Sequence, residues 1–528
     1  MVLLTPTSPL SRASGSMSSQ IMQRCACGQF HDPFDQGHGE FLASMPQDPS
    51  ALADDLIKMG LYKPQVIETA KRITRTEMMQ SVLLDRATQD PEQRKIFAEM
   101  IAQAGGLDQV MGAAFGPQAG EFFDDTLRAG PFTRRRFLKQ VLVAATLMGA
   151  TAAQGQRELQ AQESGGAPEK TDLRIGFIPI TCATPIIMAE PLGFYEKYGL
   201  NVEVVKLPSW AAVRDSAIAG ELDAYHMLSP MPISITLGLG STAFPIKLAS
   251  IENINGQAIT VANKYKDQLT GPADFAGFTI GVPFPFSMHN LLLRYYLATG
   301  GINPDTDVQI TPVPPPDSVA RLTVGDIDAM LMPDPFNQRA VFEGAGFIHM
   351  LTKDLWPGHP CCAFAASQDW IDQYPNTFQA VNKAIIDAAG YSSDAANRAE
   401  IANAISPREF LNQPEEVVAA VLTGQFEDGL GNTLDIPDRI DFDPYPWQSF
   451  AYWITSQMVR WDLLPEADVN YEAIGQDIFL TDLARSLAQE LGQEPPAESL
   501  RSETLMFDSF DPADPAAYVQ AQIEEFGV

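Results

Sequence analysis

The chain has 528 residues, of which 45% are hydrophobic and 9% aromatic, enough for two or three folded domains with sizeable cores. Of its 35 Lys and Arg and 66 Asp and Glu, residues 1–154 hold 15 and 16, which leaves 20 basic against 50 acidic residues afterwards. Nucleic acid and anionic lipid both require Lys and Arg to replace their counterions, so this composition argues against nucleic-acid binding.

Residues 1–131 are expected to form a small, mostly helical N-terminal extension. Apolar residues recur there at helical spacing in four segments that Gly and Pro separate, namely 51–59, 65–84, 91–104 and 120–127. None of these segments carries a catalytic pattern.

Two cysteines and two histidines of this extension lie within fourteen residues of one another: Cys25, Cys27, His31 and His38. Thiol and imidazole are the ligands that zinc prefers, so these four residues are candidate metal ligands. Their spacing is not that of a standard zinc finger. The alternative is a loop with incidental cysteines.

Residues 132–154 have the pattern of an export signal. The basic sequence TRRRFLK at 133–139 precedes a short apolar run of small residues at 140–153. Paired arginines in this context are typical of twin-arginine export, so we expect the rest of the chain to meet the twin-arginine machinery and reach the periplasm. It would remain tethered to the membrane if the signal is not cut. The alternative is an arginine-rich start of a buried helix.

The position of the signal is unusual, because signals ordinarily begin a chain. Either the residues before it are a cytoplasmic extension, or the start codon is assigned too far upstream. Beyond the signal, no run approaches the roughly 18 to 20 apolar residues that a spanning helix needs.

From Leu173 onward, short strands and helices alternate, which is the pattern of a parallel sheet covered by helices. A first set has strands at 173–178, 202–205 and 223–226, with a helical segment at 185–198. A second set follows Lys264, with strands at 278–282, 308–311 and 328–332 and a helix that Ser287 caps.

Two such sets predict an α/β protein with two lobes, 172–264 and 265–365. A ligand cleft is expected between them, at the carboxyl ends of the strands. Residues 366–528 are expected to form a helical return to the first lobe and a C-terminal segment.

Several motifs within residues 172–465 resemble those of the nitrate- and bicarbonate-binding proteins of ABC importers. They are LRIGFIP at 173–179, SWA at 209–211, HMLSPMP at 226–232, NGQ at 255–257, MHN at 288–290, VPPP at 313–316 and HP at 359–360. The resemblance implies a two-lobed type II periplasmic-binding-protein fold that closes on a small anion or polar solute. It also implies delivery to ABC permease subunits and no enzymatic activity. No cofactor is expected apart from a possible metal ion.

Matched motif by motif, the resemblance implies ligand contacts by Trp210, Gln257 and His289, with backbone contacts near Pro333 and Asp334. An indole N–H and an amide NH₂ donate to oxyanion oxygens, and imidazole donates once or carries charge when protonated. The alternatives are a core aromatic for Trp210 and a turn residue for Gln257.

His226 is a further cleft candidate. Its alternative interpretation is a buried histidine whose hydrogen bonds are already made.

The chain departs from the family at HPCCAF, residues 359–364. Nitrate-binding relatives have a lysine after the His-Pro pair and bicarbonate-binding relatives a glutamate, whereas this chain has Cys361 and Cys362. A neutral thiol is a weak donor and compensates an anion poorly. The departure counts against nitrate, and it favours bicarbonate, a neutral small molecule or a metal-bearing ligand.

Cys182 follows the first strand of the first set, so we expect it to line the cleft together with Cys361 and Cys362. Of these, Cys362 is a ligand-binding candidate, and Cys182 and Cys361 are cleft candidates. Three interpretations are open: a soft-metal site with His289, a redox-sensitive closure, and packing of cysteine as a small apolar residue.

Two other functions remain as alternatives. CCAF at 361–364 is similar to the Cys-Cys-x-Phe sequence of pyrimidine-precursor synthases of the thiamine pathway, which implies binding or synthesis of such a precursor. The other is a tethered ligand sensor, in which an uncut signal keeps residues 1–131 beside a cytoplasmic partner.

Overall fold

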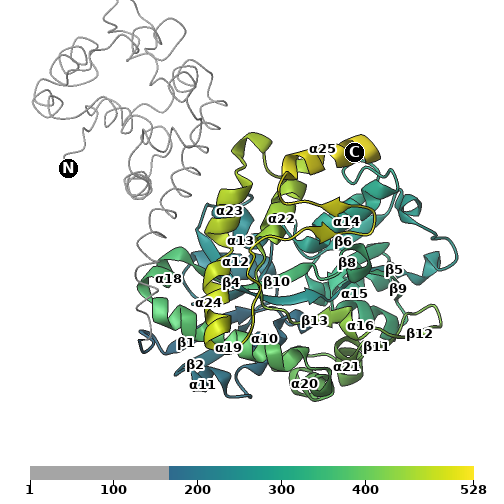
Figure 1. The fold of residues 1–528 in the computed structure, drawn as a ribbon. Coiled ribbons are helices and arrows are strands. Elements are labelled where there is room, and N and C mark those ends of the chain that lie inside the picture. The colour runs from purple at the N-terminus through teal and green to yellow at the C-terminus, as the bar shows by residue number, and fades with distance from the viewer. Residues whose placement is uncertain (1–165, 528) are drawn as a thin grey trace, which may run out of the picture. The chain divides into compact units, whose positions relative to one another are not determined.

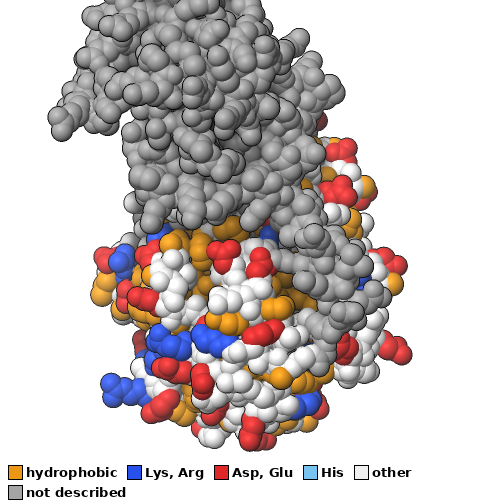
Figure 2. Space-filling view, turned by 90° about the vertical axis from the view of Figure 1, so that its left-hand side faces the viewer, with side chains coloured by type: hydrophobic (Ala, Val, Ile, Leu, Met, Phe, Trp, Pro, Cys, Tyr) orange, Lys and Arg blue, Asp and Glu red, His pale blue; other side chains and the backbone are white. Residues whose placement is uncertain are grey.

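Two mixed β-sheets form the framework of the computed structural model, which describes residues 166–527 (Figure 1). The N-terminal extension and the signal lie outside the described residues, and so do Cys25, Cys27, His31 and His38. Among the described residues, no helix combines the length and the apolar character needed to cross a membrane. Acidic side chains are scattered over the visible part of the described surface (Figure 2).

The first sheet belongs to the first lobe. Its six strands lie in the order β13 (Ile440–Asp441), β4 (Ile246–Asn255), β10 (Pro360–Ser367), β3 (Ala224–Leu228), β1 (Asp172–Phe177) and β2 (Asn201–Lys206). Strand β1 is parallel to β2 and β3, whereas β10 is antiparallel to β3 and β4. The strands expected at 173–178, 202–205 and 223–226 correspond to β1, β2 and β3.

The second sheet belongs to the second lobe. Its five strands lie in the order β7 (Gln309–Pro312), β6 (Thr279–Val282), β8 (Ala329–Pro333), β5 (Gln257–Ala262) and β9 (Gly346–Leu351). Strand β6 is parallel to β7 and β8, and β5 is antiparallel to β8 and β9. The strands expected at 278–282, 308–311 and 328–332 correspond to β6, β7 and β8.

The chain crosses between the sheets at two adjacent places. It leaves the first lobe at Asn255-Gly256 and returns at Gly358-His359, where Asn255 N–H donates to His359 O at 3.0 Å and Gly358 N–H to Asn255 Oδ1 at 2.9 Å. Gly256 has a φ of 76°, and a Cβ there would lie 2.8 Å from Cδ1 of Ile440, so only glycine fits. The crossings lie earlier than the expected boundaries at 264 and 365.

Helices cover both sheets. In the first lobe they are α10 (Thr184–Met188), α11 (Phe194–Lys197), α12 (Trp210–Ile218), α13 (Met231–Thr236), α18 (Gln368–Gln373), α19 (Pro375–Ser393), α20 (Arg398–Ile405), α23 (Tyr471–Ile478) and α24 (Thr481–Glu490). In the second lobe they are α14 (Met288–Thr299), α15 (Pro315–Val324), α16 (Phe336–Phe342) and α17 (Thr352–Leu355). The helix expected over 185–198 is instead two helices, because Gly193 between them has a φ of 71°.

The C-terminal return contacts both lobes. Helices α19, α23 and α24 pack on β4 of the first sheet, whereas α21 (Glu415–Thr423) packs on α16 and α22 (Gln448–Arg460) on α14 of the second lobe. Two small hairpins, β11 (Gln425–Glu427) with β12 (Thr433–Asp435) and β14 (Glu503–Thr504) with β15 (Ser509–Phe510), precede α25 (Pro515–Phe526).

Candidate functional site

Trp210, His289 and Gln257 lie where the strands of the two lobes end. Trp210 is the first residue of α12, directly after β2, and Ser209 Oγ caps that helix by accepting from Ala212 N–H at 3.3 Å. His289 is the second residue of α14, which follows β6, and Gln257 begins β5 opposite Pro333 at the end of β8. The fold thus brings two first-turn residues and one strand end toward the cleft.

The side chains of Trp210, Gln257 and His289 are buried, with at most 1% of each residue exposed. Within residues 166–527, no hydrogen-bond partner exists for Trp210 Nε1, for either amide atom of Gln257 or for either ring nitrogen of His289. A buried polar atom without a partner costs about 1 to 3 kcal/mol, and native proteins contain few of them. Several such atoms at the meeting of two lobes indicate a site that a polar ligand completes.

His226 on β3 belongs to the same group. Its Nδ1 accepts a hydrogen bond from Ile178 N–H at 3.3 Å, so the proton of the neutral ring is on Nε2. That Nε2–H has no partner among the described residues, and the ring lies 6.2 Å from the Trp210 ring. Burial lowers the pKa of His226 to about 4, which keeps the ring neutral at pH 7.

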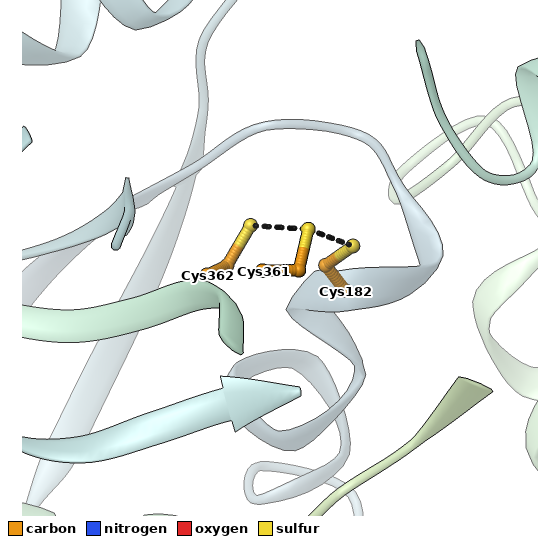
Figure 3. Close-up of side chains that lie close together, drawn as sticks. All are labelled: Cys182, Cys361 and Cys362. Carbon is orange, nitrogen blue, oxygen red and sulfur yellow. Dashed lines mark hydrogen bonds between the residues drawn. The ribbon is translucent and has the colours of Figure 1, made fainter. Parts of the chain in front are cut away.

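The three cysteines of the described part form one buried cluster (Figure 3). Cys182 lies in a 3₁₀ turn after β1 (Thr181–Ala183), and Cys361 and Cys362 lie at the start of β10. Cys361 Sγ is 3.6 Å from Cys182 Sγ and 3.6 Å from Cys362 Sγ, and all three sulfurs lie within 4.8 Å of one another. The expected gathering of these thiols is observed, and their role stays a prediction.

Burial raises the pKa of the Cys182 and Cys362 thiols well above the usual thiol value. Burial acts in the same direction on Cys361, but hydrogen bonds with the two flanking thiols and the nearby imidazoles of His289 and His359 bring its pKa well below that value. The three thiols are therefore electrostatically coupled, and Cys361, between the other two, is the one whose pKa is lowered.

Asp334 joins the two lobes, and both its side chain and its backbone are already hydrogen-bonded within the protein; its N–H donates to Gly256 O at 2.9 Å. The carboxylate forms a buried ion pair with Arg439 at 2.9 Å and accepts from Asn337 Nδ2 at 3.1 Å. Its backbone oxygen accepts from Thr181 N–H at 3.0 Å and from Thr181 Oγ1–H at 2.8 Å. Thr181 belongs to the first lobe and Asp334 to the second, so these bonds join the lobes beside Cys182.

Thr181 and His359 are two residues of this region that the sequence patterns did not single out as site residues. His359 is buried with a pKa lowered to about 4 by desolvation, and its Nε2 lies 2.9 Å from Thr352 Oγ1 and its Nδ1 3.3 Å from Pro360 O. Both of its nitrogens therefore have partners. The available signal for Thr181 was its place in the loop after the first strand, next to Cys182.

Interactions link the site residues into one region. Gln257 pairs with Pro333 in the second sheet, and the next residue, Asp334, accepts a hydrogen bond from Thr181. Thr181 is followed in sequence by Cys182, whose sulfur contacts that of Cys361. His289 lies near enough to Cys361 that each influences the other's pKa. The site is electrostatically weak toward an anion, because its histidines are neutral and the charge of Arg439 is compensated by Asp334.

An open groove of about 760 Å³ also lies between the lobes, and its lining includes Leu207 and Pro208 of the first lobe and Pro316, Phe336 and Arg339 of the second. None of the buried donors described above lines it. We take the buried region as the candidate ligand site, because the family-matched residues Trp210, Gln257 and His289 have unpartnered polar atoms there.

Comparison with known proteins gives consistent matches. Residues 166–406 match the model of the NMT1-like family. The nitrate/nitrite-binding protein NrtA of Nostoc sp. is 34% identical over 381 residues, which are 67% of this chain and 86% of that protein. The bicarbonate-binding protein CmpA of Synechococcus elongatus is 30% identical over 395 residues, 67% of this chain and 87% of its own.

Among solved structures, the crystal structure of the periplasmic nitrate-binding protein NrtA from Synechocystis PCC 6803 is similar to this chain. It aligns with a TM-score of 0.66 and 32% identity, covering 68% of this chain and 100% of that one. The α/β fold with two lobes that the sequence predicts is therefore confirmed by the structure and by this similarity.

Proposed function

Because this chain belongs to the family of nitrate- and bicarbonate-binding proteins of ABC importers, we propose that it is the solute receptor of such an importer and binds a small oxyanion that carries a hydroxyl group, of the bicarbonate type. The observation that carries this proposal is the set of buried, unpartnered polar atoms on Trp210, Gln257 and His289. They lie on both lobes, so one small solute between the lobes can satisfy them.

The hydrogen-bonding character of these atoms favours bicarbonate over nitrate. A neutral His289 offers one donor and one acceptor, and Gln257 offers an amide oxygen as well as an NH₂ group. Nitrate has no hydrogen and would leave both acceptors unpaired, whereas the single O–H group of bicarbonate can pair with one of them. The lack of an uncompensated cation among the described site residues also disfavours a ligand whose only feature is charge.

The cell location and partners belong to the same proposal. The TRRRFLK sequence and the similarity to a periplasmic protein support export by the twin-arginine machinery and docking on ABC permease subunits. The relatives reported above are binding proteins, which supports a receptor without turnover rather than a pyrimidine-precursor enzyme. Conservative substitution of the arginine pair, Arg134→Lys with Arg135→Lys, should leave the protein in the cytoplasm, which fractionation would detect.

The ligand is tested by thermal unfolding and calorimetry with bicarbonate, nitrate, nitrite and chloride. A ligand selective for the folded state adds about 2.7 kcal/mol of stability at a hundredfold excess over Kd. We expect bicarbonate to raise the Tm most, and His289→Ala to weaken its binding by about tenfold or more, since a hydrogen bond of about 1.4 kcal/mol is lost.

The matched control is His349→Ala. His349 also lies in the second lobe, but its Nε2 is 2.7 Å from Tyr296 Oη and it does not belong to the group of unpartnered atoms. This variant should bind bicarbonate as the wild type does. Absence of any shift with all four anions, or equal affinity in the His289→Ala protein, would refute the proposed function.

A further inference from the structure

The cysteine cluster has a geometry that packing does not require. Its members come from two segments 179 residues apart in sequence, yet Cys361 Sγ lies 3.6 Å from each of the other two sulfurs. When three thiolates bind one tetrahedral ion at about 2.3 Å, their sulfurs lie about 3.8 Å apart. The two distances of 3.6 Å are close to that value, and the third pair of sulfurs lies within 4.8 Å, so an ion could be bound after adjustment of the side chains.

A second and independent observation is the state of His289. This imidazole is fully buried and has no hydrogen-bond partner on either nitrogen within the described residues, and its electrostatic interaction with Cys361 contributes to lowering the pKa of that thiol. Cysteine that serves only as a small apolar residue ordinarily has apolar neighbours. Here the cluster adjoins an unpartnered imidazole, the commonest nitrogen ligand of metals.

We propose that Cys182, Cys361 and Cys362 form a binding site for a soft d¹⁰ cation, Zn²⁺ or Cu⁺. The ring nitrogens of His289 are not among the ligand atoms that lie within 4.8 Å of one another, so His289 becomes the fourth ligand only if its side chain turns toward the sulfurs. Three sulfur ligands and one imidazole are a known closed set for zinc, and thiolates also select Cu⁺. The inference shares His289 with the proposed receptor site: when an ion takes the lone pair of this imidazole, only its remaining N–H can donate to a solute.

The placement of the four ligands gives the ion a role in closure. The three thiols lie on the first lobe, whereas His289 lies on α14 of the second. An ion bound by all four residues therefore joins the lobes at the point where Thr181 already bonds Asp334. A ligating thiol must be deprotonated, so binding of the ion should weaken as the pH falls.

The experiment uses the full chain in a Cys25→Ser, Cys27→Ser background, which removes the two other cysteines. Reduced protein is loaded anaerobically with Zn²⁺ or Cu⁺ and desalted, and bound metal is counted by mass spectrometry. We expect one equivalent per chain, lost on Cys361→Ser and on Cys182→Ser. His289→Ala should weaken zinc binding by tenfold or more in competition with a chelator, and His349→Ala should not.

A metal content near zero after loading, or full retention in both serine variants, overturns the proposal. So does a disulfide between any two of the three cysteines in protein isolated from the export compartment. Retention of Cu⁺ alone, with no effect of His289→Ala, supports the three-thiol site but overturns the fourth ligand. The anion assay is read separately on each variant: a bicarbonate shift that survives Cys361→Ser leaves the receptor function standing when the metal site fails.

Discussion

Three histidines beside the cleft are kept neutral by burial rather than by charged neighbours. His226, His289 and His359 each have a pKa lowered to about 4, with desolvation as the largest cause. Neutral rings can both donate and accept, which suits a ligand with mixed hydrogen-bonding character better than a bare anion.

His226 makes this state measurable as pH-dependent stability. Its pKa is about 4 in the folded chain and about 6.5 when unfolded, so between these values the unfolded chain binds the extra proton. Stability contributed by the neutral ring is therefore complete above pH 6.5 and is lost as pH falls toward 4. His226→Asn can still accept from Ile178 N–H but does not titrate.

In urea unfolding between pH 4.5 and 6, this variant should reduce the slope of unfolding free energy against pH by up to about 1.4 kcal/mol per pH unit. An unchanged slope would show that the ring already titrates normally in the folded protein.

Single residues also show the limits of the sequence. The motifs SWA and MHN, which resemble those of the family, lead us to expect ligand contacts by Trp210 and His289, and the place of His289 just beyond a strand supports that expectation. The partners of Asp334 could not be predicted, since Thr181 and Arg439 are far from it in sequence and only the folded arrangement of the two lobes brings them together.

At the level of elements, helix caps position the site. Ser287 Oγ accepts from Asn290 N–H at 3.0 Å and so fixes the first turn of α14, which carries His289. Ser367 Oγ does the same for α18 by accepting from Trp370 N–H at 3.3 Å, in a helix that carries none of the proposed site residues.

Ser287→Ala and Ser367→Ala should each lower stability by about 1 kcal/mol, because each removes one capping bond. Only Ser287→Ala should also weaken ligand binding, since it loosens the turn that holds His289. Denaturant unfolding measures the stability of both variants, and calorimetry measures their affinity for the ligand. Equal affinities would show that the Ser287 cap does not position the ligand site.

The elements that sequence reasoning did not identify as strands share one property. Strands β4, β5 and β10 are almost entirely buried and run directly into the crossings, so they lack the alternation of apolar and polar residues that marks a half-buried strand. Strands β1, β3, β6 and β8 were recognisable because turn residues bound their apolar runs.

On the scale of the whole molecule, the Arg439–Asp334 pair stabilises the region where the lobes join. Both side chains are fully buried, and Arg439 O also accepts from Gly256 N–H at the crossing. Removing one partner of a buried pair leaves an uncompensated charge, which costs about 3 to 5 kcal/mol.

Arg439→Met should therefore lower the unfolding free energy by about this amount in denaturant titrations. Lys353→Met is the control, because the partner of Lys353 is Asp438, whose side chain is 60% exposed, and such pairs contribute about 1 kcal/mol or less. If both variants lose the same small amount, the buried pair does not have the importance that we give it.

The net charge affects the rate at which an anionic solute arrives. The chain carries −31, nearly all of it after residue 154, and this field repels anions until salt screens it. The association rate constant of bicarbonate, followed by stopped-flow tryptophan fluorescence, should rise about two- to tenfold between about 10 and 150 mM ionic strength. Two different salts exclude competition by a particular anion, and a rate that falls with salt would mean that the cleft entrance is locally attractive.

The complete enclosure of Trp210, Gln257 and His289 also has a kinetic consequence. A bound solute cannot leave while the two lobes are closed. The residence time of the solute therefore cannot be shorter than the time the lobes take to open. A more stable closed state therefore means slower release of the solute, unless the membrane permease binds the open form preferentially and so favours opening. For a receptor of this kind, delivery of the solute depends on the preference of the membrane partner for the open form as much as on the affinity of the receptor for the solute.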